Sequence, residues 1–343
     1  MKNYPLIDIL KFVSALSIIS IHTQPMLGFQ DSLWFIPYRW LQCFALPFFF
    51  VSSAYLFFSK AKTMNEKSNR GGYFVKWIKR TSILYGIYSL LNIILGLGAF
   101  FSFSWKDMIG FILLGQQNGY LWFIAALILS ITFIYGIDEA CRGNKVILRS
   151  LHGLFFLLSF FLMVVLQFGY VPISHTSLSW IADVYYQHFD NVRNFVSGIF
   201  FSYIGYMGVL LHSHYSQKLN RLAIVALGVL SLIEVWYCNV HSIWHESCQT
   251  AFGISVLLLF VIIECTHVSC KSNTLLLYMR KTSNIIYFQH RYAIILLLVV
   301  SKLLCPIQPV AMFFFTVAIM CFVSYLFFKL EATKLGKYTK YLY

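Results

Sequence analysis

The chain has 343 residues, of which 59% are hydrophobic and 11% are charged, whereas about a quarter of an ordinary soluble protein is charged. A mean hydropathy of +0.72 excludes a water-exposed surface around a chain of this size. The net charge of +14 fits either a nucleic-acid partner or basic loops on the cytoplasmic side of a membrane, and the distribution of the basic residues decides between them.

Apolar segments separated by polar breaks run along the whole chain. Each is close to the length of about 20 residues that a helix needs to cross a bilayer, and the runs are continuous, which excludes the alternating strands of a barrel. Residues 171–194 are compatible with a re-entrant or interfacial piece. The sequence therefore predicts an all-α, polytopic membrane helical bundle of about ten transmembrane helices. The expected helices span residues 5–23, 40–59, 79–101, 120–137, 149–170, 195–212, 222–239, 247–265, 283–302 and 308–328.

The basic residues gather in alternate loops. With the N-terminus inside, the inner segments hold 20 of the 26 Lys and Arg residues and the outer segments hold four. The positive-inside rule then predicts an N-in, C-in topology, and the dispersal over several loops excludes a nucleic-acid interface.

We expect residues 1–343 to form a single integral-membrane domain, surrounded by lipid in the cytoplasmic (inner) membrane and without a separate soluble domain. A homo-oligomer is left open.

The first segment, residues 5–23, carries ionisable side chains within an apolar run. No small-residue cleavage site follows it, so we interpret it as a retained helix and not as a signal peptide. Eleven helical steps bring His22 within about 20° of the direction of Lys11 and about 16 Å further along the axis. One face thus presents a cation near the inner side and an imidazole near the outer side, and Asp8 can pair with Lys11 one turn away. A snorkelling Lys11 with an interfacial His22 is the structural alternative.

Two further segments place charge at a membrane boundary. Lys76, Lys79 and Arg80 lie at the inner end of the third helix, where they suit a phosphorylated ligand or serve as a plain positive-inside anchor. Arg193 and Asn194 lie at the outer end of the sixth helix, where a basic residue runs against the charge rule. We therefore expect Arg193 to have a local partner, with structural pairing and a substrate role both open.

The ninth apolar segment is unusually polar, with Ser283, Asn284, His290 and Arg291 close together. Such residues should face the bundle interior or a water-filled cavity, because an ionisable group in lipid is costly. Packing between helices accounts for Ser and Asn but not for the two basic residues. The sequence has no C-x-x-C pair, H-E-x-x-H motif or phosphate-binding loop, so no metal site and no permanently bound cofactor are expected.

Taken together, these segments resemble the integral-membrane acyltransferase family three, which includes bacterial O-acetyltransferases of surface glycans. The resemblance extends over nearly the whole chain. Two positions depart from the family pattern, since Lys11 stands in place of Arg and Ala54 in place of Gly. The matching features are a cation and a His separated by ten residues (Lys11, His22), a Phe-rich stretch at 48–55, a basic patch at 76–80, an L-W-F signature at 121–123, an R-N-x-x-x-G stretch at 193–198 and an S-x-x-I-Y-x-x-H stretch at 283–290.

The resemblance implies a membrane O-acyltransferase that takes an acyl group, by default acetyl, from cytoplasmic acyl-CoA. The acceptor is then a hydroxyl of an extracytoplasmic carbohydrate or lipid-linked glycan. His22 and Lys11 are the implied catalytic residues, and the inner basic residues Lys76, Lys79 and Arg80 would hold the acyl-CoA. The candidates for contacts with the acceptor or the oxyanion are Arg193, Asn194, Ser283, Asn284 and His290.

Two mechanisms and two other classes of protein are weighed on the sequence. An assembly or sensor subunit without chemistry leaves the polar residues of the first and ninth segments unexplained. His22 can act as a general base on the acceptor hydroxyl, or it can carry the acyl group transiently. A secondary transporter or flippase of a glycan or small polar molecule would also use buried charges. Transporters often show inverted repeats and broken helices in matching positions, and this sequence has no such symmetry.

Overall fold

The computed structural model describes residues 4–64, 66–95, 104–115, 118–168, 180, 193–212, 216–240, 252–268, 274–334 and 336. Every regular element within this part of the chain is a helix, and the piece expected at 171–194 lies almost wholly outside it. Short helical segments, α4 (Trp105–Ile109), η2 (Gly110–Leu114) and η3 (Gly119–Leu121), lie between α3 and α5. The long helices are α1 (Pro5–Thr23), α2 (Phe35–Lys62), α3 (Lys67–Ile94), α5 (Trp122–Ala140), α6 (Lys145–Phe168), α8 (Arg193–Leu211), α9 (Gln217–Val240), α10 (Phe252–His267), α11 (Thr274–Leu303) and α12 (Pro309–Glu331).

Each of the ten expected segments overlaps one of these long helices, and α1 has the expected bounds. Seven helices of the described part are long and apolar enough to cross a membrane, namely α1, α2, α5 together with η3, α6, α9, α11 and α12. The apolar stretches of α8 and α10, Phe195–Leu211 and Gly253–His267, are shorter. The protein is thus an all-helical, multi-pass membrane protein, while the number of ten spans and the N-in, C-in topology stay predictions.

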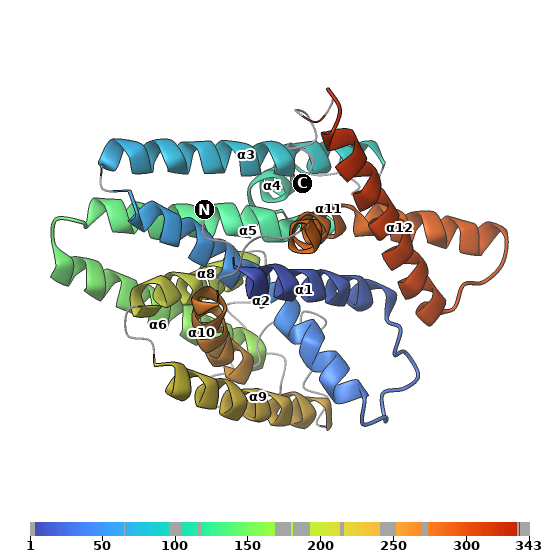
Figure 1. The fold of residues 1–343 in the computed structure, drawn as a ribbon, viewed down its shortest axis with the longest axis horizontal. Coiled ribbons are helices and arrows are strands. Elements are labelled where there is room, and N and C mark those ends of the chain that lie inside the picture. The colour runs from blue at the N-terminus through green and yellow to red at the C-terminus, as the bar shows by residue number, and fades with distance from the viewer. Residues whose placement is uncertain are drawn as a thin grey trace.

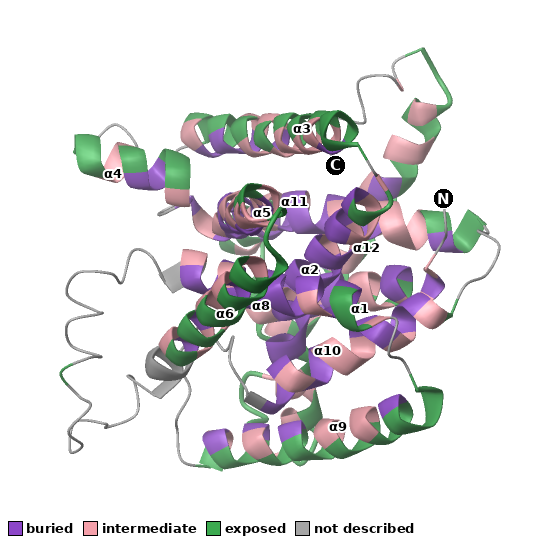
Figure 2. Cartoon of the chain, turned by 90° about the vertical axis from the view of Figure 1, so that its left-hand side faces the viewer, coloured by how far each residue is buried: buried purple, intermediate pink, exposed green. Residues whose placement is uncertain are grey.

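Helices α1 and α2 lie in the middle of the bundle, and α3 and α9 lie along opposite edges (Figure 1). The buried residues gather on the central helices, whereas α3, α6 and α9 carry many exposed residues (Figure 2). Helix α1 packs chiefly against α11 and α2, and α2 packs against α8. Helix α1 therefore lies within the bundle rather than at its edge.

The backbones of α2 and α8 approach each other closely at a glycine. A Cβ atom on Gly205 would lie 2.4 Å from the carbonyl oxygen of Val51 and 2.9 Å from the Cβ atom of Ala54. Small residues at helix crossings are common in membranes, where association depends on packing rather than on the exclusion of water. This contact fixes α2 next to α8 and buries the Phe-rich stretch that precedes Ala54.

Candidate functional site

Helices α1 and α11 run side by side, and two contacts about a dozen residues apart join them. Helix α1 is unbroken from Pro5 to Thr23, so Lys11 and His22 share one of its faces at an axial separation of about 16 Å. The first contact involves Asp8, close to Lys11. The second involves His22 itself. Both partners lie on α11, so the polar groups of α1 and α11 converge on one interface.

The first contact is an ion pair between Asp8 and Arg280. Arg280 donates from Nε to Oδ1 at 2.8 Å and from Nη2 to Oδ2 at 2.7 Å, which is the paired geometry that favours Arg over Lys. The side chain of Asp8 is 7% exposed, and that of Arg280 is 39% exposed. The expected pairing of Asp8 with Lys11 is thus replaced by a pairing with Arg280. The half-buried ammonium group of Lys11 stays within electrostatic range of both charges.

The second contact is a stack of two imidazoles, His22 and His290. Their ring centroids lie 5.2 Å apart, with 29° between the ring planes. His290 is fully buried, whereas His22 is exposed. The Nδ1 atom of His290 lies 2.8 Å from the carbonyl oxygen of Ile286 and 3.1 Å from that of Tyr287. Because a carbonyl oxygen only accepts, Nδ1 carries the hydrogen and Nε2 carries the lone pair.

The Nε2 lone pair of His290 lies in a buried environment. Its Nε2 atom is buried and has no hydrogen-bond partner among the described residues. A buried acceptor without a partner is unfavourable, and such groups are concentrated at functional sites. The stacked pair therefore has one imidazole with a defined tautomer and one that is accessible.

Tyr120 and Tyr287 form reciprocal hydrogen bonds next to His290. Tyr120, in the η3 turn before α5, donates from its hydroxyl to the carbonyl oxygen of Phe288 at 2.7 Å. Tyr287 donates in return to the carbonyl oxygen of Tyr120 at 2.7 Å. The ring of Tyr120 lies 5.1 Å from that of His290. These reciprocal bonds fix the L-W-F segment against α11 and give the His290 ring a rigid neighbour.

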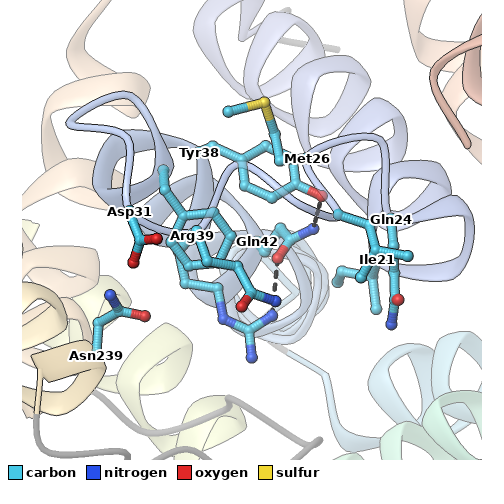
Figure 3. A pocket seen from close by; sticks show the side chains of 11 residues that line it. Ile21, Gln24, Met26, Asp31, Tyr38, Arg39, Gln42 and Asn239 are labelled. Atoms are coloured by element: carbon cyan, nitrogen blue, oxygen red, sulfur yellow. Dashed lines mark hydrogen bonds between the residues drawn. The ribbon is translucent and has the colours of Figure 1, made fainter.

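A cavity of about 460 Å³ opens where α1 ends, next to His22 in the sequence (Figure 3). It is formed by the end of α1, the connection to α2, the first turns of α2 and the end of α9. The lining is mixed, with amide, phenol, guanidinium and carboxylate groups among apolar side chains. The lining residues are Ile21, Gln24, Met26, Leu27, Gln30, Asp31, Phe35, Tyr38, Arg39, Gln42 and Asn239.

Hydrogen bonds order the polar side of this cavity. Gln42 donates from Nε2 to the hydroxyl of Tyr38 at 2.6 Å and to the hydroxyl of Ser20 at 3.1 Å. Arg39 donates to Oε1 of Gln42 at 2.9 Å, and Figure 3 shows Arg39 and Tyr38 joined through Gln42. Tyr38 and Gln42 are one helical turn apart near the start of an apolar helix, a polar pair that sequence reasoning overlooked. Two polar side chains one turn apart in an apolar helix would have indicated a polar site at this position.

The basic residues Lys76, Lys79 and Arg80 are exposed on α3. Helix α3 reaches α11 further along, where Gln289 donates to the hydroxyl of Tyr88 at 2.9 Å. This contact lies about 12 to 18 Å along α3 from the three basic residues. They are therefore not part of the imidazole stack, and their use in binding a phosphorylated donor stays a prediction.

The other acceptor or oxyanion candidates lie on α11 and at the start of α8. Ser283 donates to the carbonyl oxygen of Arg280 at 2.9 Å, within its own helix. Asn284, next along α11, is half-buried. Arg193 and Asn194 open α8, but their side chains lie outside the described part of the chain. Among the side chains that are described, no three His, Cys, Asp or Glu residues are grouped so that they could hold a metal ion.

The helical fold and the convergence of polar residues between α1 and α11 define a multi-pass membrane protein with a polar centre. Residues 4–329 match the acyltransferase domain of the acyltransferase 3 family, and the chain belongs to this family. Residues 4–329 therefore form an acyltransferase domain of this family. The resemblance inferred from the sequence motifs is confirmed.

An amino-acid racemase from Enterococcus faecalis is 27% identical to the chain over 227 residues. The match covers 64% of this chain and 29% of the relative, so the chain spans less than a third of that relative's length. No solved structure matches the chain significantly.

Proposed function

We propose that this protein is an O-acyltransferase of the cytoplasmic membrane that moves an acyl group, by default acetyl, from acyl-CoA to a hydroxyl of an extracytoplasmic carbohydrate. The observation that carries the proposal is the α1–α11 interface, with Lys11 and Arg280 toward one end and the His22–His290 stack about 16 Å along. Family membership supplies the acyl transfer. The interface offers separate places for a phosphorylated donor and for the reacting hydroxyl.

The cationic end of the interface suits the phosphates of acyl-CoA. Asp8 is already neutralised by Arg280, so the charge of Lys11 is not consumed by an ion pair with Asp8. A guanidinium that is 39% exposed and a neighbouring ammonium can both donate charge-assisted hydrogen bonds to phosphate oxygens. Lys76 and its exposed basic neighbours on α3 are proposed as additional contacts at the inner surface.

The cavity at the end of α1 suits a polyhydroxylated acceptor. Sugar hydroxyls both donate and accept hydrogen bonds, and the lining offers amides, a phenol, a carboxylate and a guanidinium for both kinds of bond. The apolar side chains of the lining can cover the less polar faces of a sugar ring. Ile21 lines the cavity and precedes His22, so an acceptor longer than one sugar unit would extend from the cavity toward the imidazole.

In the proposed reaction the oxygen of the acceptor hydroxyl attacks the thioester carbonyl, while His22 takes the proton of that hydroxyl. A positioned base contributes roughly 10²–10⁴ to the rate. His290 acts as a positioning residue, because its ring packs on that of His22 and is itself fixed by two backbone carbonyls. The alkoxide forms an ester with the acyl group, and the CoA thiol leaves with the proton.

The test is to follow radiolabelled acetyl-CoA in isolated membranes that retain the endogenous acceptor. The wild type is expected to form alkali-labile, covalently attached label, and His22→Ala at equal membrane abundance is expected to lose it. His212→Ala is the matched control and should keep the label, because this imidazole contacts Tyr55 and Thr266 and not the His22–His290 stack. Equal labelling by His22→Ala would remove its catalytic role. Uptake of label without covalent attachment in the wild type would favour a transporter.

A further inference from the structure

Arg291 is a cation in the middle of the longest described helix. It lies about 18 Å from the outer end of α11 and about 26 Å from the inner end. Among the residues that the structure describes, it has neither a carboxylate within ion-pair distance nor a hydrogen-bond acceptor. A charge at this depth is costly, and the charges that persist there usually face a cavity or serve function.

The backbone of η3 is shaped around this guanidinium. A Cβ atom on Gly119 would lie 1.6 Å from Nη1 of Arg291 and 2.9 Å from its Cζ atom. Gly119 also has a φ of +62°, in the left-handed region that favours glycine. On the other side the Cζ atom lies 6.0 Å from the centroid of the Tyr120 ring, within cation–π range. The guanidinium is therefore held in a defined place by a backbone and a ring, neither of which uses its N–H donors.

The same guanidinium is a neighbour of the imidazole stack. Its positive charge acts on both His22 and His290, the residue that precedes it in α11. The Tyr120 ring lies 5.1 Å from the His290 ring and 6.0 Å from the Cζ atom of Arg291, so it neighbours both residues. A fixed cation with unused donors beside a base is the arrangement that stabilises negative charge as it develops in a transition state.

We propose that Arg291 is a further catalytic residue, whose N–H groups bind the oxyanion formed on the acyl carbon. The inference rests on the proposed acyl transfer. As the acceptor oxygen bonds to the acyl carbon, its proton passes to His22 and the carbonyl electron pair moves onto oxygen. Arg291 donates hydrogen bonds to that oxygen. The carbonyl then re-forms, the carbon–sulfur bond breaks, and the CoA thiolate takes the proton from His22.

The proposed role of Arg291 accounts for the arginine at position 291 and the glycine at position 119, which a catalytic His22 alone does not explain. Arg291 needs a planar fork of donors, because an oxyanion accepts more than one hydrogen bond and an ammonium group presents its donors differently. A side chain at Gly119 would displace the guanidinium, because its Cβ atom would lie 1.6 Å from Nη1, and the φ of +62° independently favours glycine. Arg291 and Gly119 are thus expected to act as one unit.

The test measures covalent transfer from radiolabelled acetyl-CoA in membranes that retain the endogenous acceptor, at varied acetyl-CoA concentration. We expect Arg291→Gln to lower kcat by roughly 10²–10³, the usual effect of removing one oxyanion donor, with KM for acetyl-CoA unchanged. Arg291→Lys should be intermediate. Gly119→Ala should lower kcat without removing any charge. Lys302→Gln, which removes an exposed cation from the end of the same helix, is the control and should match the wild type.

The outcomes separate this inference from the function on which it rests. A wild type without acetyl-CoA-dependent labelling would overturn both. A labelling wild type with an unchanged kcat in Arg291→Gln would overturn the role of Arg291 alone, as would a variant that raises KM and keeps kcat. If Arg291→Gln does not accumulate as folded protein, judged by gel filtration in detergent, then Arg291→Lys and Gly119→Ala decide by the same kcat criterion.

Discussion

The ion pair between Asp8 and Arg280 gives the sharpest prediction about how α1 is held against α11. The carboxylate of Asp8 is 7% exposed and receives two charge-assisted hydrogen bonds, at 2.7 and 2.8 Å. Breaking a buried pair costs about 3–5 kcal/mol, whereas an exposed pair contributes about 0–1 kcal/mol. Because Arg280 is 39% exposed, solvent screens part of the interaction. We therefore expect a coupling free energy of about 1–3 kcal/mol.

A double-mutant cycle isolates this quantity. The variants are Asp8→Asn, Arg280→Gln and the double variant, with the free energy of unfolding measured in mixed micelles by SDS titration and tryptophan fluorescence. A second cycle pairs Asp8→Asn with Lys11→Met. The Asp8–Arg280 cycle should give the coupling above, and the Asp8–Lys11 cycle should give less than about 1 kcal/mol, as for a charge pair without a direct hydrogen bond.

The reasoning would be refuted if Asp8 coupled more strongly to Lys11 than to Arg280. That result would restore the pairing expected from the spacing within the first helix, and it would place Lys11 in a structural role. The donor proposal would then lose the ammonium group on which it depends.

Three other perturbations test neighbouring features. His290→Ala should lower kcat by up to roughly 10², because His22 loses its packing partner, with KM for acetyl-CoA unchanged in a steady-state assay; equal kcat values would contradict the positioning role. Lys11→Ala should raise KM for acetyl-CoA more than Lys76→Ala, since Lys76 is exposed on α3; the opposite order in the same assay would move the donor site to α3. Gly205→Val should destabilise the bundle by about 1–3 kcal/mol in SDS titration through overpacking against Val51, so an unchanged midpoint would argue against that close approach.

Helix bounds were predictable where hydropathy changes sharply, and less so elsewhere. The first helix has the expected bounds because polar residues flank a compact apolar run. The sequence predicted that the third helix begins at residue 79, but α3 begins at Lys67. Its first turns are basic and therefore carry no hydropathy signal. Helix α11 likewise begins at Thr274 rather than at 283. Hydropathy does not reveal the part of a helix that extends beyond its apolar segment.

The candidate site residues were more readily predicted from the sequence than their contacts. Lys11, His22 and His290 were all singled out, because ionisable residues in apolar segments are costly. Nothing in the sequence indicated that His22 would stack on His290 or that Asp8 would pair with Arg280, which is 272 residues away along the chain. The cavity lined by Tyr38 was missed altogether, since it combines α1, α2 and α9.

The amino-acid sequence by itself determined the membrane class, the approximate positions of the helices, the family and the shared face of Lys11 and His22. These follow from local quantities, namely hydropathy and a helical period of about 3.6 residues. Only the tertiary structure decided that α11 lies across from that face. In lipid, helices select neighbours through close packing and polar contacts between distant segments, such as Gly119 against Arg291, and those contacts leave no periodic signal in the chain.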